Sequence, residues 1–256
     1  MEQTAVKNKG KHYSDRTNEE NIIHMPTPFR LNLEHFDYRK AAPAITLRHA
    51  LLHMLVLIIL RPYFLLVNGY HVHGRKNLRR LGDGGFVTIS NHIHIMDAPM
   101  TGCAIGMRRV YFLTLASNFC IPVIRHLVTA LDGVPLTKEP EQVDTLFREM
   151  EKALQNGDIV HVYPEGVLVP YCDHLRTFRR GAFKMAAEAD VPVLPMVYTY
   201  RKPKGLLRLF RKKPYLLCTF LSPVYPDHSV PLRERSIRLM KQCRAEMLSA
   251  MLPERS

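Results

Sequence analysis

The strongest constraint on the fold is the alternation of strand-like and helical segments along the chain. Short apolar runs typical of strands occupy residues 85–90, 110–115, 133–136, 159–163, 193–200 and 215–221. Apolar residues at helical spacing follow at 118–131, 143–154, 181–189 and 232–252. A strand followed by a helix usually returns to a parallel neighbouring strand. The sequence therefore predicts an α/β fold with a mainly parallel sheet flanked by helices.

The length and the cysteines further limit the number of domains and the kind of protein. The 256 residues suffice for one domain with a large core and are few for two. The five cysteines are odd in number, and no two of them have C-x-x-C spacing. This pattern argues against a disulfide framework and a structural zinc site, and it fits a reducing compartment.

The N-terminal third divides into a polar extension, residues 1–40, and an apolar helical segment, residues 41–74. The extension lacks the apolar stretch of a secretory signal. The apolar run at 50–67 is interrupted by Arg61-Pro62, so we expect two short helices that lie in one leaflet of a membrane. A core helix is the second interpretation and a single span the third. The remaining domain is predicted at 75–256.

The positive charge is concentrated in two apolar windows. The net charge is +13, and residues 38–82 contain eight Lys/Arg, residues 191–226 seven, with no Asp or Glu in either window. Basic and apolar character together favours an anionic lipid surface over nucleic acid as the partner. We expect a peripheral or monotopic protein on the cytoplasmic face of a membrane, with residues 202–213 as a second contact.

The first block that can carry chemistry is Ser90-Asn91-His92-Ile93-His94-Ile95-Met96-Asp97-Ala98-Pro99, directly after a strand. If a helix begins here, Asp97 can lie beside His92, fix its tautomer and support the imidazolium that forms during proton transfer. The chain has no G-x-S-x-G motif, so a serine nucleophile lacks its usual turn. A base without a protein nucleophile indicates that the substrate supplies the attacking hydroxyl.

Three other interpretations of this block stay open. His92 and Asp97 also suit ordinary turn hydrogen bonds. His92, His94 and Asp97 together suit a metal-dependent hydrolase, although no second histidine cluster has ligand spacing, so we expect no metal and a packing role for His94. A non-catalytic basic protein that binds membranes or nucleic acid is the third.

Two further blocks contain residues suited to a site that binds an anion. Glu165-Gly166 follows a strand and a proline, and the glycine permits a positive φ or a close backbone approach. Arg176, Arg179 and Arg180 precede a predicted helix, whose N-terminus favours anions. Lys138 ends a predicted short strand and adds a further cation.

In this order and spacing, the blocks resemble the glycerophospholipid acyltransferase superfamily, whose best-known branch is the 1-acylglycerol-3-phosphate acyltransferases and to which tafazzin is related. The resemblance covers about residues 75–225 and rests on Asn91-His92 to Pro99, Tyr163 to Gly166, Phe178 to Phe183, and Val191 to Pro195. The sequence departs from the family where Gly166-Val167-Leu168 replaces Gly-Thr/Ser-Arg, and where Lys138 replaces an arginine.

The resemblance implies that 75–256 is an acyltransferase domain. His92 is then the general base and Asp97 its orienting partner. The hydroxyl of a lysophospholipid attacks an acyl-CoA or acyl-carrier protein thioester, with no cofactor. The preferred acceptor is 1-acylglycerol-3-phosphate, which gives phosphatidic acid, and a different lysolipid is the alternative.

The remaining roles are carried over in the same way. Glu165 orders the acceptor or the arginines, and Gly166 lies in the same site. Arg176, Arg179 and Arg180 replace the missing phosphate-binding arginine, with Lys138 as a further cation. Backbone N–H groups near the His92 turn or Gly166 are candidates for stabilising the oxyanion.

Overall fold

A computed structural model describes residues 36–38, 51, 54–55, 57–121, 125–126, 128–129, 131–136, 139–203 and 214–252. The strands are β1 (His71–His73), β2 (Phe86–Ser90), β3 (Val110–Leu115), β4 (Gly133–Leu136), β5 (Ile159–Val162), β6 (Val193–Arg201) and β7 (Tyr215–Phe220). The helices are α2 (Arg75–Arg79), α3 (Asp97–Ile105), α5 (Pro140–Gln155), α6 (Gly181–Glu188) and α8 (Leu232–Met251). The structure also has a π-helical turn η2 (Phe64–Asn68), a 3-10 turn η3 (Ala116–Cys120) and, directly before η2, an apolar helix whose described residues include 57–63.

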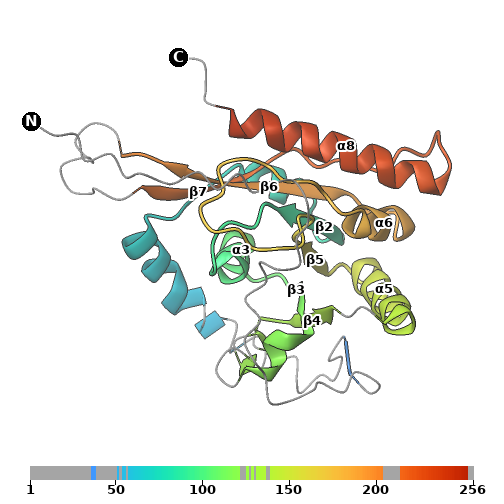
Figure 1. The fold of residues 1–256 in the computed structure, drawn as a ribbon, viewed down its shortest axis with the longest axis horizontal. Coiled ribbons are helices and arrows are strands. Elements are labelled where there is room, and N and C mark those ends of the chain that lie inside the picture. The colour runs from blue at the N-terminus through green and yellow to red at the C-terminus, as the bar shows by residue number, and fades with distance from the viewer. Residues whose placement is uncertain are drawn as a thin grey trace, which may run out of the picture.

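The strands form one seven-stranded sheet in the order β1-β7-β6-β2-β5-β3-β4 (Figure 1). Every neighbouring pair is parallel except β6 and β7, which run antiparallel. The prediction of a mainly parallel sheet flanked by helices is therefore confirmed. The pairing of β1 with β7 brings residues 71–73 into the sheet.

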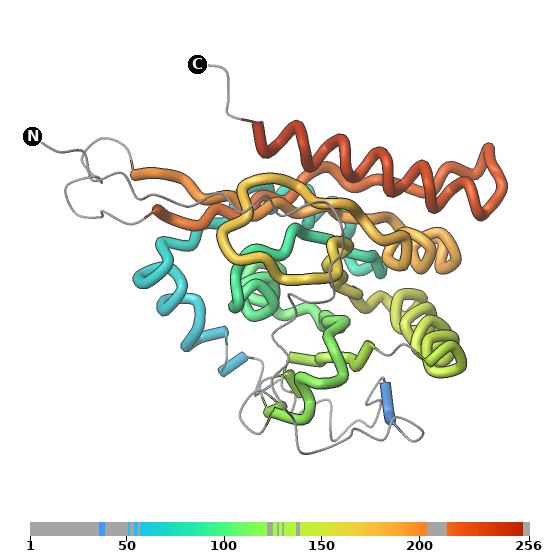
Figure 2. The backbone as a smooth tube through the Cα atoms, viewed as in Figure 1, coloured from blue at the N-terminus to red at the C-terminus, as the bar shows by residue number. Residues whose placement is uncertain are grey.

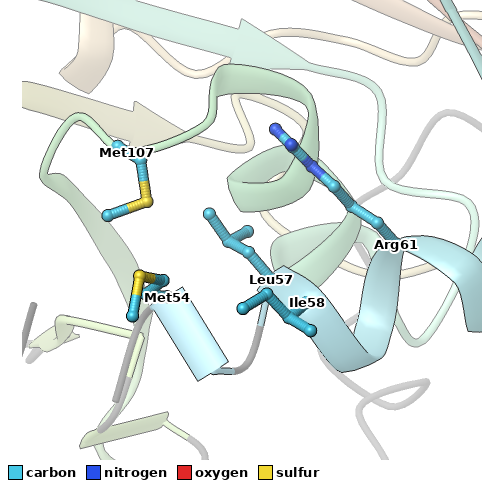
Figure 3. Close-up of a pocket in the computed structure, with 5 residues that line it drawn as sticks. All are labelled: Met54, Leu57, Ile58, Arg61 and Met107. Carbon is cyan, nitrogen blue, oxygen red and sulfur yellow. The ribbon is translucent and has the colours of Figure 1, made fainter. Parts of the chain in front are cut away.

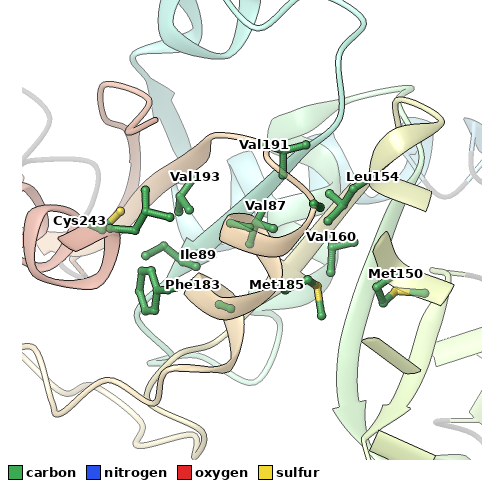
Figure 4. Packing of buried hydrophobic residues seen from close by; sticks show 14 of the residues in the cluster. Val87, Ile89, Met150, Leu154, Val160, Phe183, Met185, Val191, Val193 and Cys243 are labelled. Carbon is green, nitrogen blue, oxygen red and sulfur yellow. The ribbon is translucent and has the colours of Figure 1, made fainter. Parts of the chain in front are cut away.

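Helices cover both faces of the sheet, which explains why the central strands are apolar throughout. Helices α5, α6 and α8 lie on one face of the sheet (Figure 2). They pack over Val87, Ile89 and Val160 (Figure 4). On the other face α3 packs over Phe86 and Ile159. Alternate residues of β2 thus belong to different cores, and the loops at its carboxyl end are held from both sides.

Two local predictions about helices are wrong. The helix does not end at Arg61-Pro62. It continues through Pro62 to residue 63 and then widens into η2. A π-helical turn absorbs a local irregularity without ending the helix. Asn118 does not cap a helix either, since it lies inside η3 and its side-chain amide donates to Thr114 Oγ1 at 2.6 Å.

The apolar helix before η2 packs on the domain along one side only. Leu57 and Phe64 are buried against the α3 core. Arg61 donates two hydrogen bonds, of 3.0 and 3.2 Å, to the Cys103 carbonyl near the end of α3. No helix in the part of the chain that the structure describes combines the length and apolar character needed to cross a bilayer.

Candidate active site

His92 and Asp97 meet at the carboxyl end of β2. Asp97 is the first residue of α3 and its side chain is fully buried. Its Oδ2 atom accepts hydrogen bonds from the His92 ring Nδ1 at 3.0 Å, the Ile93 backbone N–H at 2.8 Å and the His94 backbone N–H at 2.9 Å. The carboxylate therefore fixes both the turn and the imidazole. With a proton on Nδ1, the neutral ring carries its basic lone pair on Nε2.

Asn91 holds the start of this turn against the neighbouring strand. Its side chain is buried, donates to the Tyr198 carbonyl at 2.9 Å and accepts from the Tyr198 N–H at 2.8 Å. Because the Asn91 side-chain amide is hydrogen-bonded through both its nitrogen and its oxygen, its orientation is fixed. The position of His92 is thus defined by β6 as well as by Asp97.

Glu165 lies next to His92 because β5 and β2 are parallel neighbours. Its buried carboxylate accepts from the His92 N–H at 3.3 Å, from the Arg176 N–H at 3.0 Å and from the Arg176 guanidinium at 2.7 Å. The guanidinium also donates to the Val167 carbonyl. Glu165 therefore orders Arg176, and it ties the Arg176 loop to the backbone of His92.

The predicted cations have different surroundings. Gly166 has φ of +76°, and a Cβ there would lie 2.8 Å from Arg179 Nε, so the exposed Arg179 side chain crosses directly over this glycine. Arg180 donates to Ser236 Oγ on α8 at 3.3 Å. Lys138 lies outside the described residues.

The structure also places the N–H groups expected to stabilise an oxyanion. Those of Ile93 and His94 are bound to Asp97, and that of Gly166 donates to the Tyr163 carbonyl at 3.0 Å. These three groups already have acceptors within the protein. They support the turn rather than a developing negative charge.

The alternative of a metal-dependent hydrolase finds no geometric support. His94 uses Nδ1 to accept from the Met96 N–H at 3.1 Å, so the ring closes its own turn as a packing residue. Among the described residues, no three His, Cys, Asp or Glu side chains are arranged to hold a metal ion.

Sequence reasoning missed the two rings beneath His92. Tyr163 stacks on the His92 imidazole, with ring centroids 3.9 Å apart and planes at 15°. His161 meets Tyr163 edge-on at 4.6 Å and 80°. Both belong to the block that carries Glu165, and their two-residue spacing at the end of a strand places them on the same side of the sheet. That spacing was the available signal.

The part of the chain that carries these residues matches a known protein family. A family model described as acyltransferase matches residues 69–199, which is half of the chain and spans the strands and turns just described. The chain belongs to the acyltransferase family.

Curated relatives in this family carry the name 1-acyl-sn-glycerol-3-phosphate acyltransferase. A chloroplastic protein of Brassica napus is 35% identical over 127 residues, which cover 49% of this chain and 36% of that protein. One of Arabidopsis thaliana is 34% identical over 128 residues, 49% of this chain and 35% of that protein. The chain thus spans about a third of the length of these relatives.

A solved structure shows the same fold. The 1-acyl-sn-glycerophosphate acyltransferase PlsC from Thermotoga maritima superposes with a TM-score of 0.61 at 20% sequence identity. The match covers 84% of this chain and 86% of that one. It extends the likeness in fold well beyond the segment matched by the family model.

Proposed function

We propose that this protein transfers a fatty acyl group from a thioester to the free hydroxyl of a lysophospholipid, with 1-acylglycerol-3-phosphate as the preferred acceptor. The observation that carries the proposal is the 3.0 Å contact between His92 Nδ1 and Asp97 Oδ2 at the carboxyl end of β2. Family membership and the names of the curated relatives support the reaction and the acceptor.

The chemistry follows from the fixed tautomer of His92. Nε2 removes the proton of the acceptor hydroxyl as the oxygen attacks the thioester carbonyl. The C–O bond forms, the C–S bond breaks, and the thiolate leaves with a proton returned from the imidazolium. Asp97 stabilises the imidazolium between these steps, so a protein nucleophile is not required.

Arg179 is the cation we assign to the acceptor phosphate. Arg176 is bound to Glu165 and to the Val167 carbonyl, and Arg180 is bound to α8. Arg179 is exposed and lies over Gly166, one residue from the carboxylate that contacts His92. A guanidinium there replaces the arginine that the family usually carries two residues after this glycine.

The assay is thiol release from acyl-CoA or acyl-carrier protein, with 1-acylglycerol-3-phosphate as acceptor and the diacyl product identified by mass. We expect turnover in the wild-type protein and its loss in His92→Ala. The control is His228→Ala, which removes an exposed histidine that pairs with Asp190. A folded His92→Ala variant with wild-type turnover would refute the assignment.

The acceptor headgroup is tested with a panel of lysolipids. We expect Arg179→Met to raise KM for 1-acylglycerol-3-phosphate about tenfold, since a hydrogen bond to a charged group contributes about 1.5 kcal/mol or more. Lys184→Met on α6 is the matched control, because Lys184 pairs with Glu188 at the exposed face of that helix. Equal KM values for both variants would exclude Arg179 from phosphate recognition.

We further propose that the segment before β1 binds the membrane that holds the lysolipid. Nine large apolar side chains are exposed there: Leu51, Met54, Leu55, Ile58, Ile59, Tyr63, Leu65, Leu66 and Val67. Met54, Leu57, Ile58 and Arg61 also line an open cavity of about 430 Å³ with Met107 (Figure 3). The absence of acidic residues from 38–82 complements an anionic surface.

Vesicle flotation tests this surface. We expect Ile59→Asp and Leu65→Asp to weaken binding to vesicles of anionic phospholipid, and added salt to weaken it further. The control is Tyr225→Asp, which places the same charge at an exposed aromatic outside this segment. Unchanged flotation of both segment variants would contradict the proposal.

A further inference from the structure

The stack of rings beneath His92 is built into the end of β5. Tyr163 follows β5 directly and presents the face of its ring to the imidazole at a centroid distance of 3.9 Å. The two planes are within 15° of parallel. This close, parallel contact covers one whole face of the histidine that Asp97 holds by its edge.

Tyr163 is itself fixed from below. His161 contacts it edge-on at 4.6 Å, and Phe112 of β3 lies 5.4 Å from His161. His161 is completely buried and forms a 3.4 Å hydrogen bond with Ser90 Oγ through Nε2. Burial lowers the pKa of His161 to about 3, so this ring is neutral and adds no second positive charge under His92.

The hydroxyl of Tyr163 contributes less than its ring. Burial raises the pKa of Tyr163 well above its usual value, and the negative charge of Asp97 adds to the shift. The phenol is therefore neutral at any working pH. His92 therefore contacts the face of a neutral aromatic ring, whose quadrupole favours a nearby cation.

We propose that Tyr163 is a positioning residue for the acyl transfer, one that holds the His92 imidazole in the plane from which Nε2 reaches the acceptor hydroxyl. The inference rests on the proposed function. Asp97 fixes one edge of the ring but leaves it free to tilt about the Nδ1 hydrogen bond. The stacked face of Tyr163 removes that tilt and stabilises the imidazolium that forms during the reaction.

Other groups around His92 do not replace this contact. Asp97 on α3 bonds to the ring edge, and Glu165 contacts only the backbone N–H of His92. Arg176 is turned to Glu165. His94 closes its own turn through the Met96 N–H. Among the described residues, Tyr163 is the aromatic ring stacked on His92.

The test compares Tyr163→Phe and Tyr163→Leu in the whole 256-residue chain. The first keeps the ring and removes the hydroxyl, and the second removes the ring. We expect Tyr163→Phe to stay within about twofold of wild type in kcat, and Tyr163→Leu to lose about tenfold or more with KM unchanged. Tyr111→Leu is the control, because it truncates a buried tyrosine on the adjacent strand β3.

A second readout does not depend on turnover. Stacking on an aromatic ring shifts the imidazole signals upfield in NMR spectra of the protein labelled at the histidine Cε1 atoms. The His92 signal is assigned by its loss in His92→Ala. We expect the same upfield position in wild type and Tyr163→Phe, and a downfield move in Tyr163→Leu but not in Tyr111→Leu.

The outcomes separate the positioning role of Tyr163 from the proposed acyltransferase function. An unmoved His92 signal in Tyr163→Leu, or a kcat equal to that of Tyr111→Leu, would overturn the positioning role. A rise in the KM of Tyr163→Leu, as large as its expected loss of kcat, would also overturn this role, since it would place Tyr163 against the substrate. A wild-type protein without turnover, but with a shifted His92 signal, would contradict the proposed function and support the stacking.

Discussion

The ion pair between Glu165 and Arg176 gives the sharpest prediction about how the site is held. The Glu165 side chain is 1% exposed and the Arg176 side chain 17%. The change is Glu165→Gln, which keeps the shape and removes the charge. An amide oxygen can still accept one hydrogen bond, but it no longer neutralises the guanidinium, and the His92 N–H loses a charged acceptor.

The magnitude follows from the burial of the pair. Removing one partner of a buried pair typically costs about 3–5 kcal/mol, because the other charge stays buried. Arg176 keeps the Val167 carbonyl and some contact with water, so we expect the lower limit for Glu165→Gln, about 3 kcal/mol. Arg176→Met leaves a more deeply buried carboxylate with two backbone donors and should cost a similar amount.

A double-mutant cycle isolates the interaction. The two single variants and the double variant are unfolded in urea in the same detergent. We expect the double variant to be more stable than the sum of the singles predicts, by about 2 kcal/mol, within the range seen for residues in direct contact. Additive losses, within about 0.5 kcal/mol, would refute the pairing. Because Glu165 also binds the His92 N–H, Glu165→Gln should lower kcat as well.

Three further predictions concern single residues. Asp97→Asn should reduce kcat by about a thousandfold or more with KM little changed, since an amide presents the wrong partner to His92 Nδ1; steady-state kinetics measures this. Gly74→Ala should lower the free energy of unfolding by more than about 1 kcal/mol, because φ is +72° and a Cβ would lie 2.2 Å from the Phe220 carbonyl oxygen; urea unfolding checks this. The depressed pKa of His161, about 3, means that the unfolded chain binds a proton first as pH falls. The contribution of this residue to the free energy of unfolding is therefore constant above about pH 6.5 and falls by about 1.4 kcal/mol per pH unit between about pH 6.5 and pH 3. His161→Phe should remove this slope from a pH series of urea titrations.

The sheet was predictable because its strands are apolar on both faces. Runs such as Phe86–Ser90 and Ile159–Val162 are short, rich in β-branched residues and preceded by glycine. The helical spacing read at residues 143–154 also falls within α5 (Pro140–Gln155), which is followed by Gly157 with φ of +88°. These elements could be predicted from local sequence because the tertiary contacts favour the same secondary structure as the propensity of each segment.

Long-range contacts account for what the sequence did not predict. Three arginines looked equivalent between residues 176 and 180, and only the fold shows that Arg176 is bound to Glu165 and Arg180 to α8. The break expected at Pro62 depended on local propensity alone. Burial of Leu57 and Phe64 against α3 stabilises the helix on both sides of the proline.

Helix α3 connects the apolar segment to the turn that carries His92. Its first residue is Asp97, which orients His92, and near its last turn the Cys103 carbonyl accepts from Arg61 of the apolar helix. Between these points the Tyr70 hydroxyl donates to the Met100 carbonyl at 3.0 Å. The segment proposed to meet the membrane is therefore bonded to the helix that carries Asp97. A deletion of that segment removes contacts to α3 together with any anchor, whereas a charge at Ile59 alters only an exposed side chain. Activity in detergent of an Ile59→Asp variant consequently separates membrane binding from catalysis, which a truncation cannot do.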